Sequence, residues 1–171
     1  MRILMVTAGS HGDIHPFLGV GCALAARGHD AILMTNTYFE ADARAAGLAF
    51  RPHGEHIDLP SFIREHSMMH PVRGPMQVFK WLFELTPSLL EELDRAIVDL
   101  RPDVVFHHVI CFGTGWVCAK HNIPTAVAAL QPAVWWCHDD PAPVLQREPG
   151  EARKRRARAV GRAIAPIARP L

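Results

Sequence analysis

The chain has 171 residues and a formal net charge of +1, and 49% of its residues are hydrophobic. This length is enough for one domain with its own core, and the near-neutral charge provides no overall field that would attract nucleic acid. No apolar run approaches the length of a membrane span, and Met1-Arg2 leads straight into a predicted strand without a signal-peptide region. The four cysteines form no C-x-x-C pair, which is typical of reduced core thiols, with a metal or disulfide role as the alternative. We therefore expect a cytoplasmic protein.

The N-terminal residues predict a strand, a glycine-containing turn and a helix. Residues 3–6 form a continuous apolar run that suits a strand buried on both faces of a parallel sheet. Residues 8–13 are small or polar, and Pro16 suits the first turn of a helix that ends near Gly28. In open α/β sheets such a turn lies at the carboxyl edge, where ligands bind.

This turn carries three ionisable side chains, His11, Asp13 and His15. Gly9 and Gly12 form a G-x-x-G pattern, which differs from the G-x-G-x-x-G of dinucleotide sites and from a P-loop. A carboxylate beside imidazoles at a helix N-terminus suits a general base that accepts a proton from a hydroxyl. The alternative is that Asp13 only caps the helix while both histidines are solvated.

The next residues predict alternating strands and helices. Strands are expected at residues 30–35 and 48–50, with a short helix at 37–46 between them. This alternation indicates right-handed βαβ units and a parallel sheet, which is an α/β fold. Residues 53–75 contain several prolines and predict a loop, although their histidines could ligate a metal if the segment were helical.

The second half of the chain continues the pattern. An apolar stripe predicts a helix from Met76, and Thr86-Pro87 predicts a break with a new helix that starts there and runs to Leu100. A further helix is expected at residues 113–121 with Trp116 buried. The fourth and fifth strands are expected at residues 104–106 and 125–130.

Polar and aromatic side chains follow these last two strands. His107 and His108 come at the carboxyl end of the fourth strand, at the same sheet edge as the first turn. An aromatic pair at this edge could stack on a flat or sugar-like molecule, with ordinary packing as the alternative. The residues that follow the fifth strand there are Gln131, Trp135 and Trp136.

Several of these motifs occur in an order that resembles the start of a GT-B-fold glycosyltransferase. The motifs are GSHGDIHP at residues 9–16, ARGH at 26–29, GLAFRP at 47–52 and LRPDVV at 100–105. The resemblance is to the group of sterol glucosyltransferases, rhamnosyltransferases and antibiotic glycosyltransferases, and it is densest over residues 1–54. It implies a Rossmann-like parallel sheet flanked by helices on both faces, which is one half of a GT-B fold.

The resemblance also implies roles for the residues at the sheet edge. Asp13 matches the position of the catalytic base, and His11 and His15 are neighbours that tune or replace it. His107 and His108 would lie by the acceptor or orient the base. The other implied substrate-binding residues are Gly9, Ser10, Gly12, Gln131, Trp135 and Trp136. The reaction would be an inverting transfer of a hexose or deoxyhexose to the hydroxyl of an apolar acceptor, without a metal or another cofactor.

The resemblance also predicts the domain organisation of the chain and of the whole enzyme. Residues 1–150 would form the acceptor-binding domain, for a small-molecule or lipid acceptor. Residues 151–171 would be a basic helical tail or the start of an interdomain linker. The nucleotide-sugar donor would bind mainly to a C-terminal domain or partner subunit, of which this chain contains no signature, so we expect the chain alone to be inactive.

Two further interpretations remain at this point. The basic segment at residues 153–162 could touch anionic lipid at a membrane surface, or it could be a solvated helix that packs on a domain. The chain as a whole could instead be a flavodoxin-like or other Rossmann-like binding module, or a non-catalytic subunit of a split enzyme. A binding module would hold a free nucleotide or flavin tightly by itself.

Overall fold

The computed structural model describes residues 1–71 and 73–131. Met1–Ala128 form one compact unit, which contains all the described helices and strands. Its five strands form one sheet in the order β3-β2-β1-β4-β5, and every neighbouring pair is parallel. The strands are β1 (Arg2–Val6), β2 (Asp30–Thr35), β3 (Ala49–Pro52), β4 (Val104–His108) and β5 (Thr125–Ala128).

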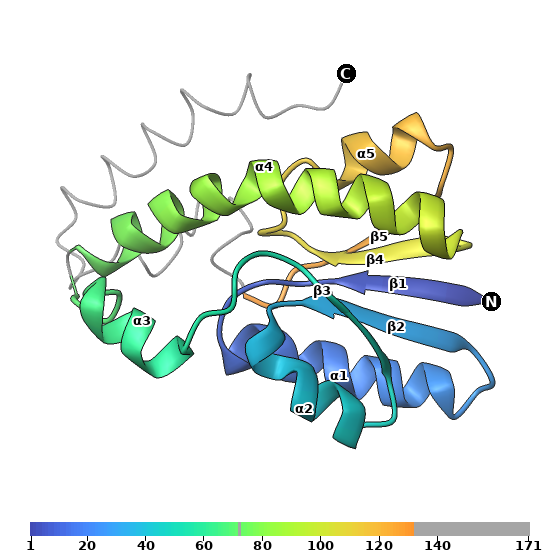
Figure 1. Ribbon diagram of the computed structural model, residues 1–171, viewed down its shortest axis with the longest axis horizontal. Helices are drawn as coiled ribbons and strands as arrows, with labels where there is room; N and C mark the ends of the chain where they lie inside the picture. The colour runs from blue at the N-terminus through green and yellow to red at the C-terminus, as the bar shows by residue number, and fades with distance from the viewer. Residues whose placement is uncertain (72, 132–171) are drawn as a thin grey trace, which may run out of the picture. The chain divides into compact units, whose positions relative to one another are not determined.

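Helices cover both faces of this sheet. Figure 1 shows α1 and α2 on one face and α4 and α5 on the other. This arrangement confirms the predicted α/β, Rossmann-like fold. The helices are α1 (His11–Ala25), the short 3-10 helix η1 (Thr37–Phe39), α2 (Glu40–Ala45), α3 (Leu59–Glu65), α4 (Gly74–Leu100) and α5 (Thr114–Lys120).

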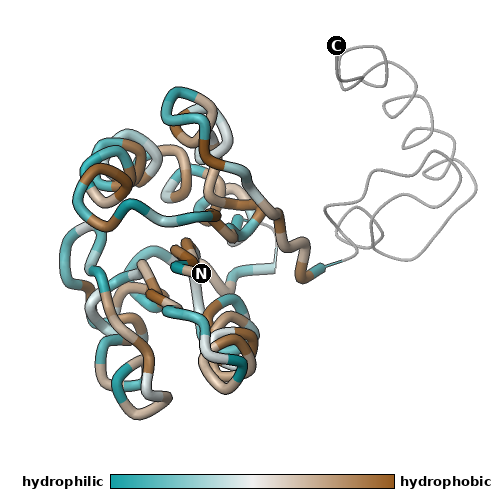
Figure 2. The backbone as a smooth tube through the Cα atoms, turned by 90° about the vertical axis from the view of Figure 1, so that its right-hand side faces the viewer, coloured by the Kyte–Doolittle hydropathy of each residue, from teal (hydrophilic) through white to brown (hydrophobic). Residues whose placement is uncertain are grey.

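The core lies around the central strand β1. Leu4, Met5 and Val6 have no exposed surface, because helices cover both faces of the strand. On the α4 side, Leu89 and Leu93 are also buried against this sheet. Burial of each such side chain contributes about 1.5–3 kcal/mol. Figure 2 shows the hydrophobic stretches of the central strands between the two helix layers.

Helix α1 begins earlier than Pro16 predicts. It starts at His11 after the N-cap residue Ser10, and Pro16 lies inside it. The buried side chains of Ile14 and Phe17 fix this turn against the sheet, so packing outweighs the local preference of proline for the first turn. The consequence is that His11, Gly12 and Asp13 belong to the first turn of the helix and not to a free loop.

The predicted loop at residues 53–75 is also partly wrong, because it contains helix α3. Asp58 caps this helix by accepting a hydrogen bond from the Ser61 N–H at 3.3 Å, and Pro60 lies in the first turn. Proline is tolerated there because its missing N–H has no partner in a helical first turn. The sequence signal was therefore present, since aspartate followed by proline is typical of a helix start.

Helix α4 runs without the break predicted at Pro87. Its buried residues Leu82 and Leu89 lie on both sides of the proline, and the Thr86 hydroxyl donates to the Leu82 carbonyl at 2.8 Å. The packed face continues across the proline, so burial holds the two halves as one helix.

The prediction that Trp116 is buried is also wrong, because this side chain of α5 is 81% exposed.

The strand order places a crevice next to β1. The chain builds β1, β2 and β3 outward in one direction, and α4 then returns it so that β4 adds on the other side of β1. In open α/β sheets, ligands bind at the carboxyl ends of the strands where the order reverses in this way. The turn after β1 and the end of β4 meet at this point.

Candidate active site

The turn after β1 holds the Asp13 carboxylate in one orientation. Asp13 Oδ2 accepts hydrogen bonds from the Ser10 N–H at 2.8 Å and from the Ser10 hydroxyl at 3.1 Å. Gly9 has a φ of +117°, and a Cβ built at this position would overlap the Asp13 carboxylate. Glycine is therefore required here for both the backbone angle and the space. Asp13 does cap α1, as the alternative interpretation predicts.

The second carboxylate oxygen of Asp13 faces His108. Asp13 Oδ1 lies 3.9 Å from His108 Nδ1, and the two side chains are 14% and 1% exposed. This distance is too long for a hydrogen bond, and neither ring nitrogen of His108 has a hydrogen-bond partner among the described residues. No described residue donates a hydrogen bond to Asp13 Oδ1. One oxygen is thus held and the other is left for a proton.

His108 is a neutral imidazole at neutral pH. Burial lowers its pKa from the ordinary value, the nearby His107 lowers it further, and the charge of Asp13 opposes this shift. The ring that faces Asp13 Oδ1 is therefore uncharged, so the two side chains do not form an ion pair. The geometry can therefore support a carboxylate that accepts a proton from a hydroxyl.

The two predicted histidines at the end of β4 lie on opposite faces of the sheet. Consecutive side chains of a strand point to opposite faces of the sheet, so His107 and His108 cannot both reach Asp13. His107 is buried, and its Nδ1 lies 3.2 Å from the His108 carbonyl oxygen. Burial lowers the pKa of His107 as well. Only His108 joins the site.

His11 and His15 lie on the exposed surface of α1. Their rings meet edge to face with centroids 5.2 Å apart, and His11 also packs edge to face on Phe39 at 5.1 Å. Neither forms a hydrogen bond with Asp13 in the described part of the chain. Gly12 is exposed beside them, with space for a side chain, since an added Cβ would lie 3.7 Å from the Ser10 hydroxyl oxygen.

A cavity of about 510 Å³ borders this turn. Its wall comes from the turn after β1, from the segment that follows β3, from α3 and from α4. Ala8 and Gly9 line it, so the cavity borders the turn that precedes Ser10 and Asp13. The principal side chains of the wall are His53, Glu55, Phe62, Trp81, Glu84 and Glu92.

His53 lines the cavity, whereas the sequence analysis considered it only among the histidines that could ligate a metal. The ring is 2% exposed, its Nε2 lies 3.1 Å from the Thr7 carbonyl oxygen, and its Nδ1 has no partner among the described residues. Burial lowers the pKa of His53, so the ring is neutral. The only available sequence signal was its place directly after the third strand, at the same edge as the other strand ends.

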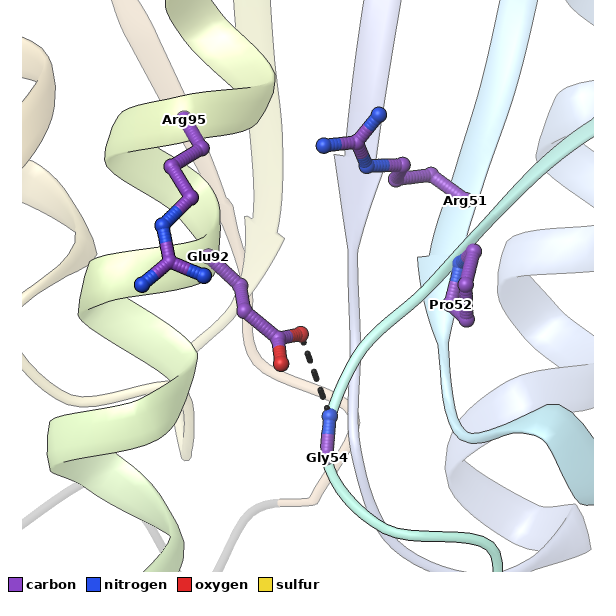
Figure 3. Close-up of a pocket in the computed structure, with 5 residues that line it drawn as sticks. All are labelled: Arg51, Pro52, Gly54, Glu92 and Arg95. Carbon is purple, nitrogen blue, oxygen red and sulfur yellow. Dashed lines mark hydrogen bonds between the residues drawn. The ribbon is translucent and has the colours of Figure 1, made fainter.

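A smaller cavity of about 340 Å³ lies next to the first one and shares two residues with it. Figure 3 shows Arg51 on the β3 side and Arg95 on α4, with the Glu92 carboxylate directed at Gly54. Glu92 Oε2 accepts a hydrogen bond from the Gly54 N–H at 3.1 Å. Glu92 therefore ties α4 to the segment after β3 and separates the two cavities.

The remaining predicted site residues follow the compact unit Met1–Ala128 in the sequence. Gln131 is exposed and follows the compact unit, while Trp135, Trp136 and the segment 153–162 lie outside the described residues. The predicted domain boundary at residue 150 lies outside them too. Within residues 1–71 and 73–131, no group of three histidine, cysteine or acidic side chains is arranged to hold a metal. In the same residues no helix combines the length and apolarity needed to cross a membrane.

Comparison with known proteins places this geometry in a family. Residues 3–126 match the glycosyltransferase family 28 N-terminal domain. The chain belongs to this family. Sequence relatives include O-mycaminosyltylonolide 6-deoxyallosyltransferase of Streptomyces fradiae, 32% identical over 100 residues, and a sterol 3-beta-glucosyltransferase of Arabidopsis thaliana, 30% identical over 105 residues. The matches cover 58% and 61% of this family 28 chain but 23% and 16% of those proteins, so the chain spans about a quarter of their length or less.

Solved structures show the same fold. The glycosyltransferase of kitacinnamycin superposes with a TM-score of 0.62 at 20% identity, over 95% of this chain and 35% of that one. The glycosyltransferase SsfS6 of Streptomyces sp. SF2575, complexed with thymidine diphosphate, has a TM-score of 0.60 at 18% identity, over 98% and 45% of the two chains. The family 28 chain is therefore one Rossmann-like half of a GT-B fold. This membership favours the glycosyltransferase interpretation over a flavodoxin-like binding module.

Proposed function

We propose that this chain is the acceptor-binding half of an inverting glycosyltransferase, in which Asp13 is the general base. The observation that carries the proposal is the state of the Asp13 carboxylate. Ser10 holds Oδ2 with two hydrogen bonds, while Oδ1 points to a neutral His108 and accepts no hydrogen bond from the described residues. This geometry lies at the strand-order reversal, beside a cavity of about 510 Å³.

The reaction is a single displacement at the anomeric carbon of a nucleotide sugar. Asp13 Oδ1 takes the proton of the acceptor hydroxyl while that oxygen forms a bond to the anomeric carbon. The bond from the anomeric carbon to the phosphate oxygen breaks, and the nucleotide diphosphate leaves with the electron pair. Attack from the side opposite the leaving group inverts the anomeric configuration. Asp13 then returns its proton to solvent.

The substrates follow from the two halves of such an enzyme. The acceptor is an apolar molecule with a hydroxyl group, such as a lipid, a sterol or a natural product, and it occupies the cavity lined by Phe62 and Trp81. The donor is a nucleotide sugar of a hexose or deoxyhexose, and it binds mainly to a C-terminal domain or partner subunit. The SsfS6 structure with thymidine diphosphate supports a nucleotide donor. Cytoplasmic location and membrane contact through residues 153–162 stay predictions.

The test is Asp13→Asn in the complete enzyme, with this chain joined to its donor-binding half. The amide keeps an oxygen that accepts from the Ser10 N–H but cannot take a proton at neutral pH. We expect turnover to fall by about 10²–10⁴-fold, the usual contribution of a general base, with little change in acceptor affinity. Turnover is measured as release of the nucleotide diphosphate.

The matched control is Asp42→Asn. Asp42 is an exposed acidic residue in the first turn of α2, so its change removes a helix-end charge without touching the site. Turnover of this variant should equal that of the parent enzyme. A loss of less than tenfold in Asp13→Asn would contradict its role as the base and would favour His11 or His15.

A further inference from the structure

The larger cavity has an acidic wall. Three carboxylates, Glu55, Glu84 and Glu92, line it, and no lysine or arginine of the described residues does. Glu84 has a cation nearby, Lys80 at 3.7 Å, but both side chains are about two-thirds exposed, so this ion pair is weak. A neutral apolar acceptor needs no carboxylate in its pocket. The negative charge of the wall therefore bears on the charge of the ligand.

Two aromatic rings stand in the same wall. Phe62 of α3 and Trp81 of α4 are both half-buried, with ring centroids 5.7 Å apart and planes inclined by 58°. The faces of aromatic rings carry negative charge density and attract ammonium groups, with tryptophan the strongest. Inclined rings beside carboxylates are an environment that favours a cation over a neutral group of the same size.

The hydrogen-bonding groups of the wall are mainly acceptors. The neutral His53 donates from Nε2 to the Thr7 carbonyl, and its Nδ1 is a buried atom without a hydrogen-bond partner among the described residues. Two donors of the wall have partners, since Asn36 Nδ2 donates to the Glu55 carbonyl and the Ser88 hydroxyl donates to the Leu85 carbonyl, whereas the Trp81 indole N–H has no hydrogen bond among the described residues. A ligand group that only donates hydrogen bonds complements this wall. A protonated amine is such a group.

The arginines of the neighbouring cavity do not line the larger cavity. The Arg51 guanidinium pairs with Asp99 at 3.0 Å, and the Arg95 guanidinium lies 3.5 Å from Glu91. Both belong to the smaller cavity, and Figure 3 shows them on its two sides. The Arg51 pair is partly buried, whereas the Arg95 pair is as exposed as the Lys80–Glu84 pair and equally weak.

We infer that the acceptor carries a protonated amine, which binds in the larger cavity against Trp81 and Phe62 and near the Glu92 carboxylate. This inference rests on the proposed acceptor-binding function and specifies the substrate class. Gly9 lines the cavity and packs closely against the Asp13 carboxylate. An amine that binds in the cavity therefore positions the rest of the acceptor beside the proposed base. The cavity thus selects among hydroxylated acceptors by charge.

The test compares two probes of equal size, 2-phenylethylamine and 2-phenylethanol. Each is titrated into the ¹⁵N-labelled 171-residue chain at neutral pH, and affinity is read from backbone and indole N–H chemical shifts. We expect the amine to bind about tenfold more tightly, because ring faces and carboxylates both favour the cation. Added salt should reduce this difference. Equal affinity, or tighter binding of the alcohol, would overturn the inference.

Substitutions of single glutamates test which carboxylate causes the preference for the amine. Glu92→Gln keeps an oxygen for the Gly54 N–H but removes the charge, so amine affinity should fall by roughly three- to tenfold while alcohol affinity stays the same. Glu91→Gln is the control, because Glu91 is exposed on the same helix and does not line the cavity. The NMR spectra also report whether each variant is folded. An amine preference that survives in Glu92→Gln would contradict the assigned contact.

The outcomes separate this inference from the proposed function. If both probes bind equally, the charge preference fails while the Asp13→Asn test of the complete enzyme still decides the function. If neither probe shifts the residues of the cavity wall, the cavity is not the amine site and the inference is wrong whatever the Asp13 result. If the amine binds selectively but Asp13→Asn keeps its turnover, the cation site stands and the base assignment fails.

Discussion

Two pairs of histidines differ in how they relate to Asp13. His11 and His15 flank it in the sequence but lie on the exposed surface of α1. His53 and His108 are distant in the sequence and buried: His53 directly follows β3 and His108 ends β4, two strands that are separated in the sheet by β2 and β1. Side chains two positions apart on a helix diverge, whereas the carboxyl ends of parallel strands converge on one edge. Closeness to a candidate base along the chain is therefore weak evidence of partnership, and a strand end is stronger.

The largest stability effect that tests this comparison is expected at Gly9. Gly9→Ala introduces a Cβ that overlaps the Asp13 carboxylate at a φ of +117°, so we expect the free energy of unfolding to fall by about 1–3 kcal/mol. Urea denaturation of the chain measures this loss. Gly19→Ala is the control, because nothing lies within 4 Å of a Cβ at this helical position. Gly19→Ala should raise the free energy of unfolding by about 0.5–1 kcal/mol. If Gly9→Ala lowers the free energy of unfolding by no more than this amount, the turn is not tightly packed.

The next effect is expected at His108, if its role is to position or tune the proposed base Asp13. His108→Gln in the complete enzyme replaces a neutral buried ring 3.9 Å from Asp13 Oδ1 with an amide. We expect kcat to fall by about tenfold, which corresponds to about 1.4 kcal/mol, and the acidic limb of the pH–rate profile to move. A lower kcat with an unchanged pH profile would indicate a purely structural role.

A smaller effect concerns the pH dependence of stability. Burial lowers the pKa of His53 in the folded chain, so the unfolded chain binds more protons once the pH falls below the ordinary histidine value of about 6.5. The free energy of unfolding should therefore decrease as the pH is lowered from about 7.5 to 5.5. In His53→Leu this slope should be shallower. Chemical denaturation across this range measures it, and an unchanged slope would show that His53 is not the titrating group.

The smallest effect is expected at the histidines next to Asp13. His11→Ala and His15→Ala each remove an exposed ring that makes no hydrogen bond with Asp13 in the described chain. We expect turnover of the complete enzyme to change by less than about twofold, which is below 0.5 kcal/mol. The same assay as for His108→Gln provides the comparison. A larger loss at His11 than at His108 would reverse the assignment of the two pairs.

Local pattern alone was enough for much of the fold and for the turn that carries Asp13. The apolar run of β1, the Gly9–Asp13 turn and the alternation of strands and helices depend on neighbours in the chain, so the parallel sheet and Asp13 could be predicted from the sequence. The helix boundaries at Pro16 and Pro87 were predicted wrongly, because burial of the helix faces outweighs the local preference of proline.

Only the tertiary structure decided which groups surround Asp13. His108 rather than His107 faces it because alternate side chains of β4 point to opposite faces of the sheet. The acidic, aromatic cavity joins segments that follow β1 and β3 to α3 and α4, which no local pattern brings together. The sequence by itself thus determined the strand, the turn and the candidate base, since these depend on local residues. Their buried partners depend on strand order and burial, which arise only when the whole sheet forms.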